Sequence, residues 1–254
     1  MWSSPPSLLS PNLRCDMQSF TAAELLELWE RGQGCDALER DLQLLAFAQT
    51  EADAETLAGY DLGLRDWLLL RLRRALFGSA IVAYTDCPHC CERLEMQLDA
   101  RELQDEEPPP EPSMYHSPDG TRFRLPNTRD LLAIRHAGDE SQAARWLLQR
   151  CRIDQAATDE ISTEVDDSLL DEVDRGLGRI AAERSPRLAL ACAQCRNEWE
   201  LAFDPGQLLW EELQARAAAV IGEVDRLAMA YGWSETEILA LSQTRRSAYL
   251  ERVH

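Results

Sequence analysis

The sequence predicts an α+β fold that is mainly helical and carries a pair of β-hairpins brought together from distant parts of the chain. Helix-capping patterns precede long segments of apolar periodicity, and two short β-type segments each contain a Cys-x-x-Cys motif. Of the 254 residues, 45% are hydrophobic and 28% are charged, a composition typical of globular proteins. This length allows one body with appendages or two small domains.

Helices are expected over residues 21–79, an N-terminal helical region that follows a flexible, Pro/Ser-rich lead at residues 1–20. Thr21 and Glu24 have the spacing of a capping box, in which each side chain accepts a hydrogen bond from the other residue's backbone amide. The helix that they begin should end near Arg31. A second helix should start near Asp36, and a third should cover Leu64 to Phe77.

Two similar hairpins are expected on either side of a long insertion. The first follows Ala80 and contains Cys87-Pro-His-Cys90, and the second follows Leu188 and contains Cys192-Ala-Gln-Cys195. Counted from the second cysteine of each pair, apolar residues recur at every second position, namely Leu94, Met96 and Leu98, and then Trp199, Leu201 and Phe203. This internal repeat describes two strand pairs, each with two thiols at its turn.

The insertion between the hairpins, at about 100–187, should hold an acidic loop and helices. Residues 102–118 are rich in proline and carboxylates, so we expect a solvated loop there, followed by a turn at Asp119 and a strand at 122–125. Helices should begin near Thr128 and Ser141. Between Asp154 and Asp174 nine carboxylates occur without a basic residue, which indicates a solvated acidic helix or, alternatively, an acidic docking surface.

The C-terminal region, residues 204–254, should again be helical. Asp204 can cap a long helix whose first turn suits Pro205. Apolar residues along this helix form one continuous stripe that should pack on the protein's own core, namely Leu213, Ala217, Val220, Val224, Leu227 and Tyr231. Ser234 and Glu237 form a second capping box, and Ser242 should cap a short last helix.

Charge and composition argue against several classes of function. All 26 basic residues are arginine, and 45 acidic residues give a net charge of -19, so nucleic acid is a poor partner. The absence of lysine excludes Schiff-base chemistry and a P-loop, and only four histidines are present. Apolar runs are too short to span a membrane, and the N-terminus does not resemble a secretory signal. We therefore expect a non-enzymatic, cytoplasmic protein of a bacterial cell, without a membrane or a small-molecule substrate.

The paired cysteines predict a structural zinc site held by Cys87, Cys90, Cys192 and Cys195. Two such turns supply four thiolates, which leaves no open position for water, and residues 80–203 would then form a zinc-ribbon-like region around the insertion. Because 101 residues separate Cys90 from Cys192, the metal would join distant parts of the chain. Cys91 or His89 could replace one of these ligands.

Other roles for the cysteines are also considered. A disulfide framework is disfavoured in a cytosolic protein. Cys-Pro-His-Cys is also the active-site tetrapeptide of some thioredoxin-like thiol oxidases, so Cys87 and Cys90 could alternatively form a thiol-disulfide redox pair. Cys15, Cys35 and Cys151 have no partner at metal spacing and are interpreted as small apolar residues.

Several segments together resemble the baseplate hub assembly chaperone family of T-even-type phages and bacterial contractile injection systems. In order, these segments are Gly63-Leu-Arg-Asp-Trp-Leu-Leu-Leu-Arg-Leu-Arg-Arg-Ala-Leu-Phe-Gly78, the first cysteine pair, Phe123-Arg-Leu-Pro126 with Asp130-Leu-Leu132, the second pair with Trp199, and Tyr231-Gly-Trp-Ser-Glu235 with Ile238-Leu-Ala-Leu-Ser242 and Arg245-Arg246. The resemblance covers roughly residues 20 to 253, and its C-terminal part is the most specific.

The resemblance implies a non-enzymatic chaperone or component that helps baseplate or hub proteins of a contractile tail to assemble. No catalytic residues carry over, and the zinc prediction rests on the cysteine repeat of this sequence alone. Aromatic and arginine side chains often anchor interfaces, so Trp233, Arg245, Arg246 and Tyr249 are the predicted partner-binding residues, unless the aromatic rings only pack the last helices. A zinc-ribbon protein-binding adaptor in transcription is a third hypothesis, which the charge disfavours.

Overall fold

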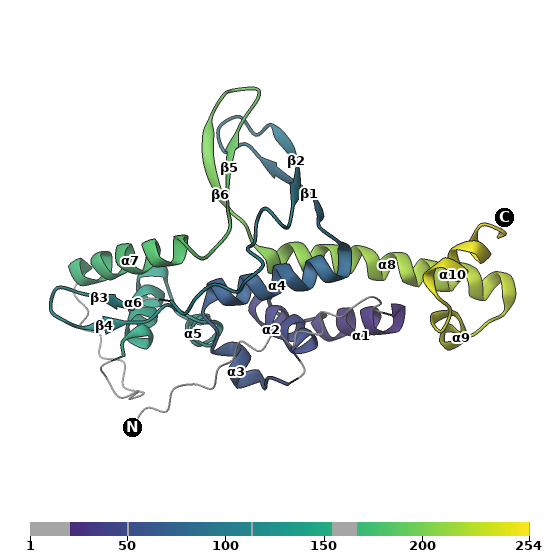
Figure 1. Cartoon of the computed structure of the whole chain (residues 1–254), viewed down its shortest axis with the longest axis horizontal. Coiled ribbons are helices and arrows are strands. Elements are labelled where there is room, and N and C mark those ends of the chain that lie inside the picture. The colour runs from purple at the N-terminus through teal and green to yellow at the C-terminus, as the bar shows by residue number, and fades with distance from the viewer. Residues whose placement is uncertain (1–20, 50, 113, 154–166, 254) are drawn as a thin grey trace.

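Helices from both ends of the chain pack around one apolar core in the computed structural model, which describes residues 21–49, 51–112, 114–153 and 167–253. They are α1 (Ala22–Gly32), α2 (Ala37–Ala48), α3 (Ala54–Ala58), α4 (Leu62–Phe77) and α8 (Pro205–Tyr231). α4 lies along the first part of α8 (Figure 1). α2 packs against both of these helices, and α1 packs against α2 and α8. The lead expected at residues 1–20 lies outside the described residues.

The predicted caps account for where these helices begin. Thr21 and Glu24 form a complete capping box, and Asp36 caps α2. α4 begins at Leu62, two residues earlier than expected, because the Asp61 carboxylate accepts hydrogen bonds from the amides of Gly63 and Leu64.

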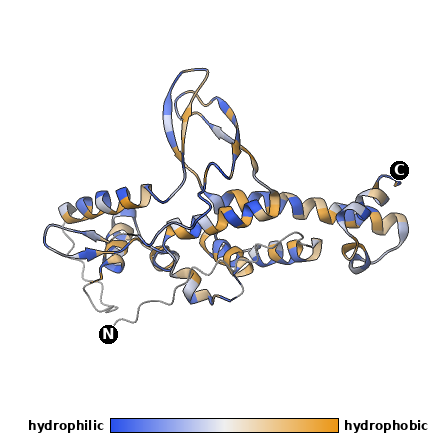
Figure 2. Ribbon diagram, in the orientation of Figure 1, coloured by the Kyte–Doolittle hydropathy of each residue, from blue (hydrophilic) through white to orange (hydrophobic). Residues whose placement is uncertain are grey.

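The core of this helical body consists mainly of leucines. Leu45, Leu57 and Leu69 are fully buried together with Leu213 of α8, and burial of each side chain contributes roughly 2 kcal/mol. The stripe predicted for α8 packs on this core as far as Val224. Leu227 is buried but lies outside this cluster, and Tyr231 at the end of the stripe is 38% exposed. Figure 2 shows the resulting stripes of hydrophobic and hydrophilic residues along the helices.

The helical body contains buried carboxyl groups, of which Asp41 lies beside the start of α8. Asp41 of α2 is 7% exposed and lies so close to the start of α8 that a Cβ at Gly206 would be 2.1 Å from its Oδ1. Burial raises the pKa of Asp41 to about 7, although the nearby Arg65 guanidinium, 3.5 Å away, acts in the opposite direction. Gly206 is therefore required by the close approach of Asp41.

Two antiparallel hairpins project from the end of α4 and the start of α8 (Figure 1). The first pairs β1 (Ala80–Asp86) with β2 (Arg93–Asp99), and the second pairs β5 (Arg187–Ala191) with β6 (Glu198–Ala202). At their base, Ile81 and Phe203 pack in one cluster with Leu70 of α4. Both hairpins thus pack on α4 at their base, although they are far apart in sequence.

Arg73 of α4 joins the first hairpin to α8. Its guanidinium, 2% exposed, donates to both oxygens of Glu212 at 2.6 and 2.8 Å and to the carbonyl oxygens of Gly78 and Ala80, each at 2.7 Å. Each of its three nitrogens therefore donates at least one hydrogen bond, and a carboxylate compensates the charge, which lowers the cost of burying it.

The insertion forms a lobe of its own, with a small apolar core. It contains β3 (Tyr115–His116) paired with β4 (Arg122–Phe123), followed by α5 (Thr128–Ile134), α6 (Glu140–Cys151) and α7 (Asp167–Ala182). Phe123, Leu148, Cys151 and Val173 form its buried core. The helices expected near Thr128 and Ser141 are confirmed, whereas the strand expected at 122–125 ends at Phe123. Most of the acidic tract, residues 154–166, lies outside the described residues, and its last part lies on α7.

The loop expected at 102–118 is present over residues 102–112, most of which are at least partly exposed, but the expectation fails in two respects. First, β3 lies within it. Second, Gln104 is only 9% exposed, and its amide donates to the backbone oxygen of Trp67 at 2.7 Å, while the Trp67 indole donates to the oxygen of Asp105 at 3.0 Å. The polar groups of α4 thus supply the partners that the proline-rich segment cannot provide for itself.

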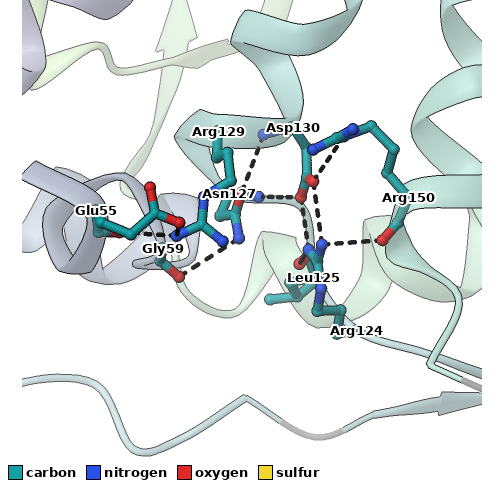
Figure 3. A network of polar contacts seen from close by, with 8 residues as sticks. All are labelled: Glu55, Gly59, Arg124, Leu125, Asn127, Arg129, Asp130 and Arg150. Atoms are coloured by element: carbon teal, nitrogen blue, oxygen red, sulfur yellow. Dashed lines mark hydrogen bonds and ion pairs between the residues drawn. The ribbon is translucent and has the colours of Figure 1, made fainter. Parts of the chain in front are cut away.

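A buried carboxylate ties the insertion together (Figure 3). Asp130, 0% exposed, accepts from the guanidinium of Arg124 at 2.5 and 3.0 Å and from Arg150 at 3.1 Å. Burial alone would raise the pKa of Asp130, but the hydrogen bonds and charge of Arg124 hold it below its usual value. Next to it, Asn127 and Arg129 contact the backbone oxygens of Gly59 and Glu55, which attaches the lobe to the helical body.

The last two helices pack on the distal part of α8. They are α9 (Glu235–Leu239) and α10 (Gln243–Leu250), and the predicted caps Ser234 with Glu237, and Ser242, are present. Within the described residues, every helix is too short or too polar to cross a bilayer.

Candidate metal centre

The tips of the two projecting hairpins bring four thiols together. Cys87 and Cys90 come from the turn between β1 and β2, and Cys192 and Cys195 from the turn between β5 and β6, and all four Sγ atoms lie within 4.8 Å of one another. The closest approaches cross between hairpins: Cys87 to Cys195 and Cys90 to Cys192, each 3.6 Å. Because each first cysteine faces the other hairpin's second cysteine, the two turns are related by an approximate twofold arrangement.

The two turns have the same backbone geometry. In the first, the amide of Cys91 donates to the oxygen of Cys87 at 2.9 Å and the amide of Cys87 to the oxygen of Glu92 at 2.8 Å. In the second, the amide of Arg196 donates to the backbone oxygen of Cys192 at 2.8 Å, and the amide of Cys192 donates to the backbone oxygen of Asn197 at 2.9 Å.

The residue after the second cysteine is left-handed in both turns. Cys91 and Arg196 each have a φ of 59° and are the only non-glycine residues with positive φ in the described ranges. This conformation costs roughly 1–2 kcal/mol for an L-residue. Neither cysteine nor arginine favours a positive φ, so the sequence contains no signal for this conformation. It is explained by the reversal of the chain direction after each pair of thiols.

Backbone amides and neighbouring thiols set the proton affinities at the centre. Burial of the Cys87 thiol acts to raise its pKa, but the amides of Cys90 and His89 point at its sulfur and lower the pKa to about 7. The amide of Glu92 has the same lowering effect at Cys90, yet burial and the three neighbouring thiols raise the pKa of Cys90 to about 12. Without a cation, four thiolates at this separation would repel one another strongly.

Side chains of the hairpin strands next to the thiol-bearing turns alternate between buried and exposed positions. Met96 is buried and Trp199 is partly buried, whereas the neighbouring Glu95, Glu198 and Glu200 point to solvent. Trp199 lies opposite Leu190 in the second hairpin. The predicted alternation is thus present on β2 and β6, where more buried apolar residues alternate with exposed polar ones. On β1 the exposed face carries Val82 and Tyr84, which are 51% and 54% exposed.

The remaining cysteines and His89 do not join the thiol cluster. His89 and Cys91 belong to the same turn as Cys87 and Cys90, but they are exposed and lie outside the four-thiol group. Cys151 is fully buried in the core of the insertion, as a small apolar residue would be, and burial raises its pKa to about 12. Cys35 is partly buried beside the oxygen of Arg31, and Cys15 lies outside the described residues.

The tetrapeptide Cys87-Pro-His-Cys90 occupies a turn between antiparallel strands and does not begin a helix. In thioredoxin-like oxidases the helix N-terminus activates the first thiol. That feature is missing at this turn, and the nearest sulfur of the other hairpin already contacts each of the two cysteines.

The predicted partner-binding residues lie together at the far end of α8. Trp233 stacks on Tyr231, with ring centroids 4.7 Å apart, and meets the edge of Tyr249 at 4.9 Å. Arg245 is exposed, whereas Arg246 is 3% exposed, with its Nε 2.9 Å from Glu223 and its Nη1 2.6 Å from the oxygen of Leu241. Arg246 therefore fastens α10 to α8. A role for Trp233, Arg245, Arg246 and Tyr249 in partner binding stays a prediction.

Chemically, the four-thiol cluster is suited to binding one soft metal ion through sulfur alone. The chain matches no family model, no curated protein and no solved structure at a significant level.

Proposed function

We propose that Cys87, Cys90, Cys192 and Cys195 bind one structural Zn²⁺, which fastens the two hairpins into a zinc-ribbon-like arm on a non-enzymatic assembly chaperone or component of a contractile-tail baseplate. The observation that carries the metal is the convergence of two matching turns from distant segments. The resemblance of several segments to hub assembly chaperones supports the role in assembly.

The spacing of the sulfurs suits zinc. A tetrahedron with zinc–sulfur arms of about 2.3 Å has edges of about 3.8 Å. The two cross-hairpin distances of 3.6 Å are close to this edge, and the largest spread within the group is 4.8 Å. A small contraction of the longer separations would complete the shell. With four sulfur ligands the ion has no vacant position for a substrate, so its contribution is to stability.

Three of the segments that resemble the chaperone family contribute arginines to ion pairs that connect separate elements of the fold. The first supplies Arg73, which connects α4, α8 and the first hairpin. The segment at residues 123–132 supplies Arg124 and Asp130 of the insertion network, and the C-terminal segment supplies Arg246, which fastens the last helices. These ion pairs fix the positions of the helices and hairpins relative to one another. A fixed arrangement of surfaces supports the role of an assembly factor that binds client proteins.

Metal analysis of untagged protein, purified without added zinc, tests the metal. We expect one zinc per chain, loss of zinc in Cys195→Ser, and retention of zinc in the matched control Cys91→Ser, which alters an exposed cysteine of the first turn outside the cluster. A metal content near zero, with Cys87 and Cys90 joined by a disulfide, would instead support the redox hypothesis.

Affinity capture from bacteria that express a contractile-tail gene cluster tests the role in assembly. We expect hub or wedge proteins of the baseplate to co-purify with the chain. Recovery of transcription proteins in place of baseplate proteins would favour the adaptor hypothesis. The two experiments are independent, because a zinc-loaded protein could still lack a baseplate client.

A further inference from the structure

The insertion contains an apolar groove between α6 and α7, at the end of the molecule opposite α10 (Figure 1). One wall is formed by Ala144, Leu147 and Cys151 of α6, at the spacing of successive helical turns. The other wall runs from Leu170 to Ala181 of α7, roughly 16 Å or three turns of helix. The hollow has a volume of about 460 Å³, within the range of about 300–1,000 Å³ usual for ligand sites.

The floor of the groove is fixed, whereas its walls are open. Leu148 and Val173 at the bottom are 7% and 1% exposed and belong to the buried core of the insertion, but Leu147, Leu170 and Leu177 are only partly buried. At Gly178, an added Cβ would meet no atom within 4 Å, so the α7 wall has free space in front of it. These partly covered leucines could bury more apolar surface against a further helix.

The rim of the groove is acidic. Glu140, Asp171 and Asp174 line it, no arginine does so among the described residues, and no ion pair involves these three carboxylates there. In a chain with a net charge of -19, this rim would repel an acidic occupant, including a second copy of the same chain. A basic occupant is favoured by the same field.

We propose that the groove between α6 and α7 binds an amphipathic helix of another protein, with apolar residues at i, i+3, i+4 and i+7 that enter the groove and arginines or lysines beside them that face Glu140, Asp171 and Asp174. This is the helix-in-groove mode of recognition, in which apolar anchors supply affinity and flanking charges set orientation and association rate. The site is separate from the thiol cluster, and it does not depend on the metal or on a baseplate client.

The probe for this site is a fluorescein-labelled peptide of about 14 residues, with leucines at that spacing and arginines at its remaining positions. Its dissociation constant for the full chain is measured by fluorescence anisotropy, beside a peptide in which every arginine is replaced by glutamate. We expect saturable binding of the arginine peptide, at least about tenfold weaker binding of the glutamate peptide, and weaker binding as salt rises from about 50 to about 300 mM.

Gly178→Trp is the decisive variant, because it fills the groove from a position where the side chain meets no neighbour, and it replaces a poor helix former. Gly222→Trp on α8 is the matched control, since Gly222 is also helical and unobstructed but lies outside the groove. We expect Gly178→Trp to weaken peptide binding at least about tenfold at unchanged melting temperature, and Gly222→Trp to leave it unchanged. If Gly178→Trp unfolds the protein, the double variant Asp171→Asn with Asp174→Asn should still lower both the affinity and its salt dependence.

Several results would overturn the proposal. They are the absence of saturable binding, equal binding of the glutamate peptide, and peptide binding that Gly178→Trp leaves intact. Self-association of the free protein that Gly178→Trp abolishes, measured by sedimentation, would show that a second copy occupies the groove.

Discussion

Substitution of either partner in the buried ion pair between Arg73 and Glu212 should destabilise the protein strongly, and the two losses should not be additive. Arg73 is 2% exposed, so Glu212→Gln removes the charge that compensates a buried guanidinium. The new amide NH2 group is a donor, so it cannot accept the hydrogen bond from the Arg73 N–H that it would face. Loss of one partner of a buried pair costs about 3–5 kcal/mol. Because Glu212 is 26% exposed and water can reach the site, we expect the lower end, about 3 kcal/mol.

Arg73→Met should cost at least as much for a different reason. It removes the donors to the carbonyl oxygens of Gly78 and Ala80, each worth about 1–3 kcal/mol if left unsatisfied, while the methionine fills part of the volume of the arginine stem. Once the guanidinium is gone, Glu212 can turn to water. The double variant should therefore be only slightly less stable than Arg73→Met, with a coupling energy of about 2 kcal/mol between the two sites.

The measurement is urea unfolding followed by tryptophan fluorescence and by circular dichroism, for the wild type, both single variants and the double variant. Arg74→Met is the matched control on the next residue of α4. Its partner Glu106 is 75% exposed, so loss of that ion pair should change the midpoint little. If the two single effects simply add in the double variant, or if Arg74→Met is as harmful as Arg73→Met, the reasoning about buried charge is refuted.

Three further predictions concern the metal centre and a buried acid. Removal of metal with a chelator should increase hydrogen exchange in the two hairpins while the core of α1 and α2 stays protected, as measured by mass spectrometry. An equal loss of protection in both regions would contradict a metal that stabilises only the hairpins. Arg196→Gly should keep or slightly raise the melting temperature, whereas Arg196→Val should lower it, because φ is 59° at this position; the reverse order would refute the assigned backbone geometry. The pKa of Asp41 is raised to about 7, so the folded state holds a proton that the unfolded state loses near pH 4, and stability should fall as pH rises from about 4 to 7 by at most about 4 kcal/mol. Asp41→Asn should flatten that part of the pH profile of unfolding, and an unchanged profile would exclude Asp41 as its source.

Local chemistry explains why the helix boundaries and the hairpin pattern could be predicted. Thr21 with Glu24, and Ser234 with Glu237, satisfy backbone amides within three residues, so the sequence alone is enough to recognise these helix starts. Likewise, alternation after Cys90 and Cys195 follows from the two faces of a strand. The same repeat placed two thiols at each turn, and the structure brings the four sulfurs within 4.8 Å of one another, across 101 intervening residues.

Interactions between distant segments decided the remaining features. Nothing in the run of arginines in α4 distinguishes Arg73 from Arg74, and only the approach of Glu212 and the first hairpin makes one of them buried while the other stays partly exposed. The segment around Gln104 was expected in solvent because its own backbone cannot form regular structure, but α4 supplies hydrogen-bond partners that the local sequence does not reveal.

The sequence by itself determined the caps, the strand periods and the four thiols, because each depends on residues only a few positions apart. Only the tertiary structure decided that Arg246 is buried against Glu223 and that α6 and α7 leave a groove with an acidic rim. Burial, ion pairing and the shape of a surface depend on which segments meet in space, and those contacts are selected by the packing of the whole chain.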